Sequence, residues 1–123
     1  MKKLILITLL IFSSPSYAEW TAVTKTSDGY NFYVDFDTIR VVDGYLYFWY
    51  LSDFPEPFEG DLSVITYVQS DCKLFRSKRL QFIYHTENMG GGRAQPEEPI
   101  EKGWQYPPPD TVMAVVLEEV CSR

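Results

Sequence analysis

The segment Tyr45 to Leu51 (YLYFWYL) constrains the fold of this 123-residue chain most strongly, because every residue in it is apolar or aromatic. A strand directs successive side chains to opposite faces, so a strand of this composition needs cover on both faces. We therefore expect it to lie at the centre of a sheet. A helix, a loop or a second copy of the chain could supply the second cover. Its aromatic side chains suit either a core or a contact surface, and we favour the core.

Alternating and β-branched residues predict further strands around this segment, over residues 19–25, 30–36, 62–69 and 74–86. The dipeptide Asp43-Gly44 predicts a tight hairpin, and the glycines at 90–92 predict a turn. Residues 52–61, which are acidic and contain two prolines, and the proline-rich residues 93–109 predict irregular loops.

Apolar residues recur at helical spacing near the end of the chain, at Val112, Met113, Val116, Leu117 and Val120. This spacing predicts a helix over residues 111–120 with Asp110 as its N-cap, although the β-branched content leaves a strand as the alternative. We expect an α+β fold, in which a single antiparallel β-sheet of about five or six strands packs against a C-terminal α-helix.

The first residues have the pattern of a secretory signal peptide. Two lysines precede an apolar run over residues 4–12, and Ser16 and Ala18 occupy the −3 and −1 positions of a small-residue cleavage site. We expect residues 1–18 to be removed and residues 19–123 to form one domain. The apolar run has about half of the ~20 residues that a membrane span needs, so we expect no transmembrane segment.

Export also bears on the two cysteines, Cys72 and Cys121. An exported chain meets an oxidising compartment, which favours a single Cys72–Cys121 disulfide. A metal-binding or redox pair is the alternative, but the sequence has no C-x-x-C motif to support it. Cleavage after Ala18 would leave Glu19 and not a cysteine at the new N-terminus. We therefore expect a periplasmic protein, or one secreted to the cell surface, and not a lipoprotein.

The charge balance narrows the choice of partner. Residues 19–123 hold nine basic and seventeen acidic residues, a net charge of −8 with His85 neutral. Nucleic-acid binding and broad attraction to anionic lipid both require basic surface, so neither is expected. An acidic protein is instead suited to basic protein partners.

Four basic residues nevertheless cluster at Lys73, Arg76, Lys78 and Arg79. They are the candidate ligand contacts, for an anion or a sulfated glycan, and local pairing with the acidic half of the chain is the favoured alternative. Strand alternation would place Arg76 and Lys78 on one face and Lys73 and Arg79 on the other, if no bulge intervenes.

No residue set predicts catalysis or cofactor binding. His85 is the single histidine and no nucleophile–base pair accompanies it. The acidic residues between 53 and 61 do not follow the spacing of an EF-hand, and Gly90–Gly92 lacks the following Lys-Ser/Thr of a phosphate loop. We expect no enzyme activity, no metal and no cofactor.

An ordered set of short motifs resembles the surface-adhesin protein E family of Gram-negative bacteria. The set consists of Trp20, YVDFDTIR (33–40), DGYLYFWYL (43–51), SDC (70–72), KLFRSKRLQFIYHT (73–86), Met89-Gly90, Trp104, Pro109-Asp110 and Cys121.

The resemblance implies an antiparallel sheet with a C-terminal helix, a Cys72–Cys121 bond and a non-enzymatic envelope protein. The family's adhesin binds host extracellular-matrix and serum proteins and is a lipoprotein, unlike the chain expected here. A protein partner, either a host matrix protein or an envelope protein, is therefore the leading expectation. A sulfated glycan ligand and a homodimer are further expectations. The alternatives are a soluble periplasmic inhibitor of a basic enzyme such as lysozyme, or an envelope accessory protein.

Overall fold

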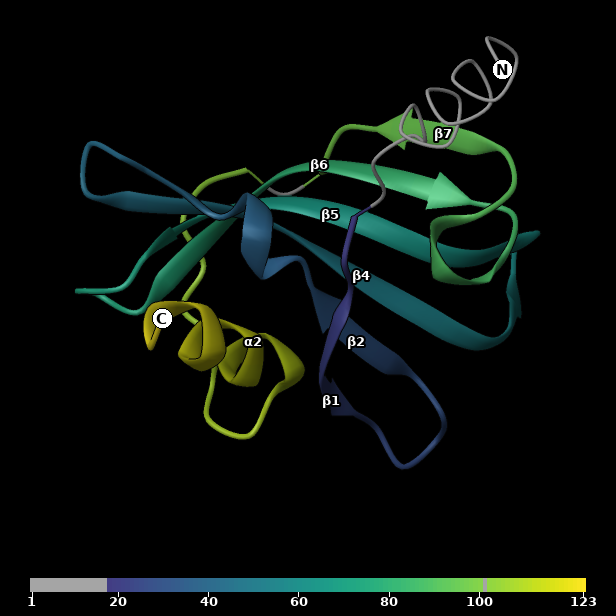
Figure 1. The fold of residues 1–123 in the computed structure, drawn as a ribbon, viewed down its shortest axis with the longest axis horizontal. Helices are drawn as coiled ribbons and strands as arrows, with labels where there is room; N and C mark the ends of the chain where they lie inside the picture. The colour runs from purple at the N-terminus through teal and green to yellow at the C-terminus, as the bar shows by residue number, and fades with distance from the viewer. Residues whose placement is uncertain (1–17, 101) are drawn as a thin grey trace, which may run out of the picture.

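The computed structural model describes residues 18–100 and 102–123, so most of the predicted signal peptide lies outside the described residues. Within them, seven strands form one antiparallel sheet, and one α-helix packs against one of its faces (Figure 1). The strands are β1 (Thr21–Lys25), β2 (Asn31–Val34), β3 (Arg40–Val42), β4 (Tyr45–Phe58), β5 (Asp61–Asp71), β6 (Arg76–His85) and β7 (Ala94–Glu97). The helices are the 3-10 turns η1 (Phe36–Thr38) and η2 (Asn88–Gly90) and the α-helix α2 (Val112–Cys121).

The predicted fold class and the disulfide are thus confirmed. None of the helices in the described part of the chain is long and apolar enough to cross a membrane.

Strand β4 occupies the centre of the sheet, as its composition predicts. The order is β1-β2-β4-β5-β6-β7, and β3 pairs with β4 beyond the end of β2. Asp43 and Gly44 join β3 to β4 as a two-residue hairpin, with φ angles of 53° and 84°. Both angles are positive, as a type I′ turn requires, which explains why Asp-Gly stands here.

The core lies between the sheet and α2. Phe48, Tyr50 and Val68 project from the sheet and contact Val116 and Leu117 of the helix. All but Tyr50 are fully buried, and Tyr50 is 7% exposed. The predicted helix is therefore confirmed, and its predicted apolar face is the one that packs on the sheet. The alternative prediction of a strand for this segment is wrong.

The predicted N-cap of this helix is wrong. The N-cap of α2 is Thr111, whose hydroxyl accepts a hydrogen bond from the Ala114 N–H at 3.3 Å, and not Asp110, which has a positive φ of 65°. The 3-10 turn η1 has Asp35 before it and Asp37 inside it.

Two predicted loops are strands in the structure. Residues 52–61 extend β4 and start β5. The two prolines are tolerated because they lie between Asp53 and Phe58, where the register shifts and the ladder of backbone hydrogen bonds is interrupted. Residues 94–97 form the edge strand β7, whose Pro96 is tolerated at an edge. A bulge in β6 leaves Leu80 out of register between Arg79 and Gln81, so Leu80 does not share a face with Phe82 and Tyr84.

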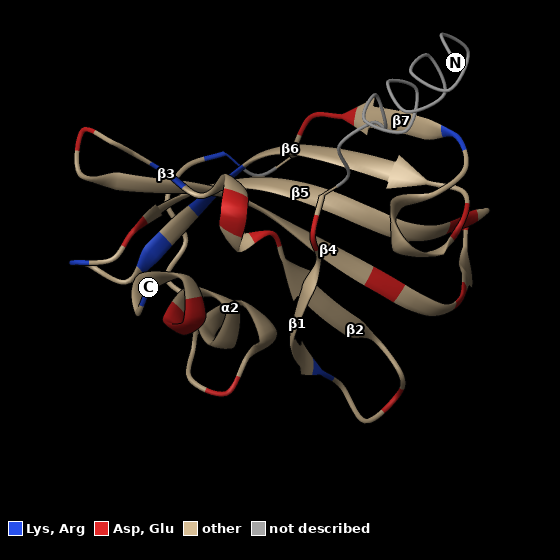
Figure 2. Cartoon of the chain, viewed as in Figure 1, with Lys and Arg blue, Asp and Glu red and all other residues tan. Residues whose placement is uncertain are grey.

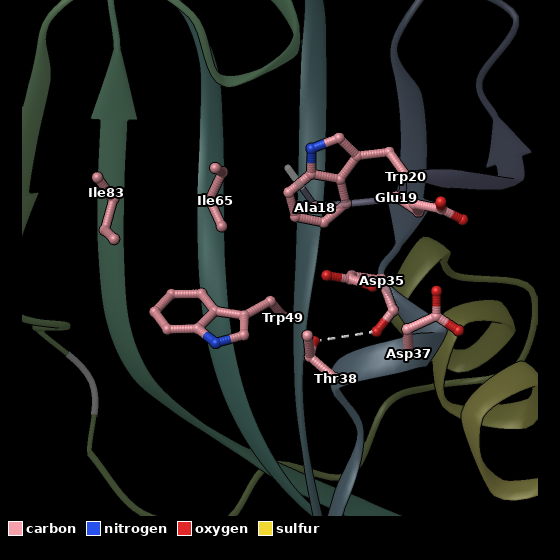
Figure 3. Close-up of a pocket in the computed structure, with 9 residues that line it drawn as sticks. All are labelled: Ala18, Glu19, Trp20, Asp35, Asp37, Thr38, Trp49, Ile65 and Ile83. Atoms are coloured by element: carbon pink, nitrogen blue, oxygen red, sulfur yellow. Dashed lines mark hydrogen bonds between the residues drawn. The ribbon is translucent and has the colours of Figure 1, made fainter. Parts of the chain in front are cut away.

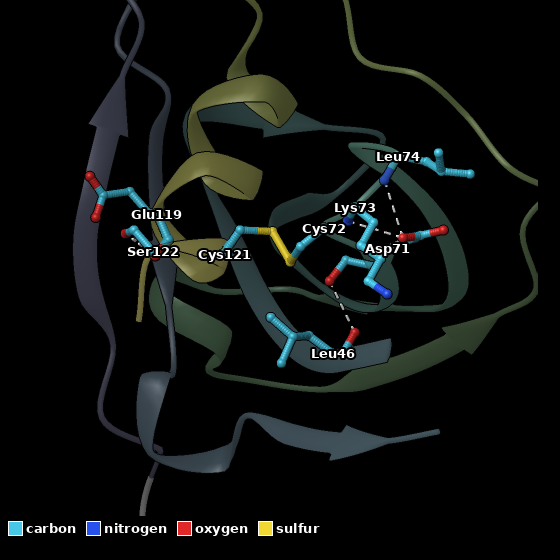
Figure 4. The surroundings of a disulfide bond; sticks show 9 residues. Leu46, Asp71, Cys72, Lys73, Leu74, Glu119, Cys121 and Ser122 are labelled. Atoms are coloured by element: carbon cyan, nitrogen blue, oxygen red, sulfur yellow. Dashed lines mark hydrogen bonds between the residues drawn. A yellow bond between two sulfur atoms is a disulfide. The ribbon is translucent and has the colours of Figure 1, made fainter. Parts of the chain in front are cut away.

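The disulfide joins the turn after β5 to the last residue of α2, with a Cα–Cα distance of 5.7 Å between Cys72 and Cys121 (Figure 4). The helix end is thereby tied to the sheet covalently as well as by its apolar stripe. The two cysteines lie 49 residues apart in the sequence, so the bond closes a large part of the domain.

Asp71 organises the turn that carries Cys72. Its Oδ1 accepts hydrogen bonds from the N–H groups of Lys73 (3.1 Å) and Leu74 (3.3 Å), and its Oδ2 accepts one from Arg76 Nε at 3.0 Å. Burial raises the pKa of the Asp71 carboxyl, but the hydrogen bonds from Leu74, Arg76 and Lys73 together with the charge of Arg76 outweigh it. The pKa of Asp71 therefore lies below its ordinary value of 3.8.

The double variant Cys72→Ser/Cys121→Ser should lose about 4 kcal/mol of unfolding free energy, because the unfolded chain is no longer restricted by the cross-link. Urea unfolding of the wild-type and variant proteins measures this loss. A reducing agent should bring the wild-type protein to the stability of the variant and leave the variant unchanged. A wild-type protein indifferent to reductant would contradict the prediction.

Asp71→Asn should destabilise the protein in a pH-dependent way. A carboxyl group with a lowered folded-state pKa contributes stability above its unfolded pKa, and this contribution is lost as the pH falls through the folded value. The stability gap between wild type and variant should therefore be full at neutral pH and shrink below about pH 4. Asp110→Asn, an equal charge change at an exposed turn residue, is the control. A stability difference between wild type and Asp71→Asn that does not change with pH would contradict the lowered pKa of Asp71.

Candidate functional site

The face of the sheet opposite α2, which we call the helix-free face, carries a row of aromatic side chains. In β4 the odd-numbered residues point to this face, whereas Phe48 and Tyr50 point to the helix. Trp49 lies against Tyr67 of β5 with ring centroids 4.4 Å apart, and Tyr47 lies 6.1 Å from Tyr67. All three are half-buried, so the expectation that this strand is core on both faces is only partly fulfilled.

Basic residues gather along the start of β6 (Figure 2), and Arg76 and Lys78 among them lie on the helix-free face. The guanidinium of Arg76 lies 4.2 Å from the ring centroid of Trp104, and Lys78 Nζ lies 4.7 Å from it. Trp104 also packs on Tyr45, with ring centroids 5.5 Å apart, and so anchors the proline-rich segment on the sheet. Arg76 further donates to the Tyr106 hydroxyl at 3.3 Å and to Asp71, so its charge is engaged within the protein.

The four predicted basic contacts do not form one patch. Arg76 and Lys78 share the helix-free face, as alternation predicted. Lys73 lies exposed in the turn between β5 and β6, outside the strand. Arg79 is exposed and pairs in register with the core residue Val68, so it belongs to the helix side, where it lines small hollows. The bulge at Leu80 follows Arg79 and does not alter this division.

The other end of the helix-free face is acidic and hollowed (Figure 3). A cavity of about 520 Å³, which we call the Asp35 groove, has apolar walls formed by Trp20, Trp49, Ile65 and Ile83. The carboxylates at the groove belong to Glu19, Asp35 and Asp37. In Figure 3 the Asp35 side chain lies between the indoles of Trp20 and Trp49.

Asp35 is the unusual member of this groove. Its residue is only 3% exposed, and its Oδ1 is one of two buried side-chain atoms in the described residues with no hydrogen-bond partner. The second is Nδ1 of His85, at the end of β6. The sequence carries no local signal for this burial, because an acidic residue at a strand end is most often solvated, and only the fold shows Asp35 to be buried.

The remaining candidates have structural surroundings. Asp53 Oδ1, in the acidic segment that lacks the spacing of an EF-hand, accepts hydrogen bonds from Asn88 Nδ2 (3.0 Å) and the Met89 N–H (2.8 Å). Gly90 has a positive φ of 73°, and a Cβ there would lie 3.0 Å from Ile65, which explains the glycine in this turn. No group of three or more metal-ligating residues exists among residues 18–100 and 102–123.

Comparison with known proteins gives a family. A family model described as surface-adhesin protein E matches residues 20–122. A crystal structure of Haemophilus influenzae protein E is similar, with a TM-score of 0.62, 18% identity, and coverage of 88% of this chain and 91% of that chain. The selenomethionine form gives a TM-score of 0.63, again at 18% identity, and covers 88% and 89%. A comparison with curated protein sequences found no match.

The structural likeness at this identity establishes the fold, and the family model spans nearly all of the described residues. The chain belongs to the surface-adhesin protein E family.

Proposed function

We propose that this protein is an exported, non-enzymatic binding protein of the bacterial envelope that contacts a protein partner through its helix-free face. The observation that carries the proposal is the half-buried aromatic row on this face, with Trp49 and Tyr67 at its centre. Aromatic side chains beside charged groups are the composition typical of protein interfaces. Membership in an adhesin family supports the same conclusion.

Host extracellular-matrix proteins are the partners that this family membership favours. The chain carries bases at one end of the aromatic row and carboxylates at the other, so a partner with matching charges would be oriented on the face. Arg76 is held by Asp71 and Tyr106, whereas the exposed Lys73 and the half-buried Lys78 remain the better candidates for an acidic partner group or a sulfated glycan.

A periplasmic inhibitor of a basic enzyme is the second candidate. Its support is the acidic balance of the chain, with a net charge of −6, together with the carboxylates of the Asp35 groove. An acidic surface accelerates the encounter with a basic protein. Inhibition of lysozyme by the purified protein would favour this candidate, and unchanged lysozyme activity would remove it.

Location separates the two candidates. Protease treatment of intact cells should degrade a surface adhesin, whereas a periplasmic protein should be protected and released by osmotic shock. We expect cleavage on intact cells. Protection, with release by shock, would overturn the adhesin form of the proposal and leave an envelope partner.

Binding to immobilised matrix proteins and to heparin should be saturable at near-physiological salt. Lys73→Gln/Lys78→Gln should weaken heparin binding several-fold, because each lysine contributes a modest exposed contact that salt screens. The double variant Lys25→Gln/Lys102→Gln removes the same charge from exposed lysines elsewhere and should bind normally. Equal weakening in both variants would show that only net charge matters, and the basic pair would lose its role.

A further inference from the structure

The floor of the Asp35 groove is a preformed apolar surface. Ile65 of β5 and Ile83 of β6 are neighbours in register and are half-buried beside Trp49. Trp20 forms the opposite wall just before β1. A cavity of about 520 Å³ with such walls is of the size that holds a large side chain and its neighbours.

The buried Oδ1 atom of Asp35, a residue that lines this groove, has no hydrogen-bond donor among the described residues. Its backbone is fixed, because its N–H donates to the Trp49 carbonyl at 3.3 Å and its carbonyl accepts from the Thr38 hydroxyl at 3.3 Å. An ionised carboxylate can only accept hydrogen bonds, and burying one without a donor is costly. Asp35 is thus positioned for a donor that the described residues do not supply to Oδ1.

The surrounding charges indicate which donor fits. The other charged side chains at the groove, Glu19 and Asp37, are acidic, and the guanidinium of Arg40 donates to the Tyr67 hydroxyl at 2.8 Å. An anionic ligand would meet three carboxylates. A neutral donor would satisfy Oδ1 but leave the negative charge uncompensated.

We propose that the Asp35 groove binds the cationic side chain of an arginine or lysine, flanked by apolar residues, in a basic segment of a protein partner. The cation donates to Asp35 and lies against the indoles of Trp20 and Trp49, where cation–π attraction adds to the charge pairing. The flanking apolar side chains cover Ile65 and Ile83. This inference rests on the proposed binding function and assigns it a site at the acidic end of the helix-free face.

Two peptides that differ in charge alone test the inference. The probes are N-acetylated Leu-Arg-Leu amide and the same peptide with citrulline, the neutral isostere of arginine. Protein produced from the full chain should bind the arginine peptide with a change in tryptophan fluorescence, and the citrulline peptide at least about tenfold more weakly. Equal affinity for the two peptides, or no binding of the arginine peptide, would overturn the proposal.

Variants locate the binding. Asp35→Asn keeps the shape of the side chain and should abolish the preference for arginine without lowering the thermal stability, since a buried amide costs less than an unpaired carboxylate. Asp43→Asn makes the same charge change in the exposed β3–β4 hairpin, where asparagine also accepts the positive φ of 53°, and should leave binding unchanged. Ile83→Thr should weaken both peptides equally by removing apolar contact. Retained arginine preference in Asp35→Asn would refute the site.

Other occupants give different results. If the amino group of a chain beginning at Glu19 satisfied Asp35, only N-terminally acetylated protein would bind the peptide. If a second copy filled the groove, the peptide would convert a sedimenting dimer to a monomer. Either result overturns the proposal. If Asp35→Asn binds matrix proteins as tightly as the wild-type protein does, the site is refuted and the proposed function stands. If the wild-type protein prefers the arginine peptide but binds no protein, only the proposed function is refuted.

Discussion

The apolar character of β4 on both faces is the constraint from which the arrangement of this molecule follows. One helix covers only the face of Phe48 and Tyr50, so the opposite face must find its cover elsewhere. The turn around η2 buries Leu51, and Trp104 packs on Tyr45. Between these two covers Trp49 and Tyr67 remain half-buried, and here the Asp35 groove opens. The half-buried aromatic surface on this face is thus a consequence of a two-sided strand in a one-helix domain.

The charged ends of the helix-free face differ in how far the protein itself satisfies them. Arg76 contacts Asp71, Tyr106 and Trp104, so most of its hydrogen-bonding and stacking capacity is used within the chain. Asp35 has no donor for its Oδ1 among the described residues, although it is more deeply buried. A satisfied charge gains little from a partner, because a new contact must replace an old one, whereas an unsatisfied one gains the whole interaction. This contrast favours the acidic end as the place where binding is selective.

The sequence predicted the fold well because its strongest signals are local or chemically restricted. The composition of residues 45–51 predicts a central strand, the Asp43-Gly44 dipeptide predicts a hairpin, and a chain with two cysteines allows only one intramolecular pairing. The strands at residues 52–61 and 94–97 were not predicted, because proline is locally unfavourable in a strand. In the assembled sheet the prolines of the first segment lie at a register shift, and Pro96 of the second lies in an edge strand.

The site was harder to predict for the same reason. The basic residues are adjacent in sequence, but strand geometry sends Arg79 to the helix side and leaves Lys73 in a turn. The groove instead joins Trp20, Asp35 and Ile83 from distant segments, and nothing in the local sequence marks Asp35 as buried. Burial of a carboxylate without a donor lowers the stability of the free domain, and a cation that donates to it relieves that cost only in the bound state. Affinity at such a groove therefore depends more on charge pairing than on the apolar area that is buried. Apolar residues alone could not distinguish a basic segment from a neutral segment with the same apolar side chains.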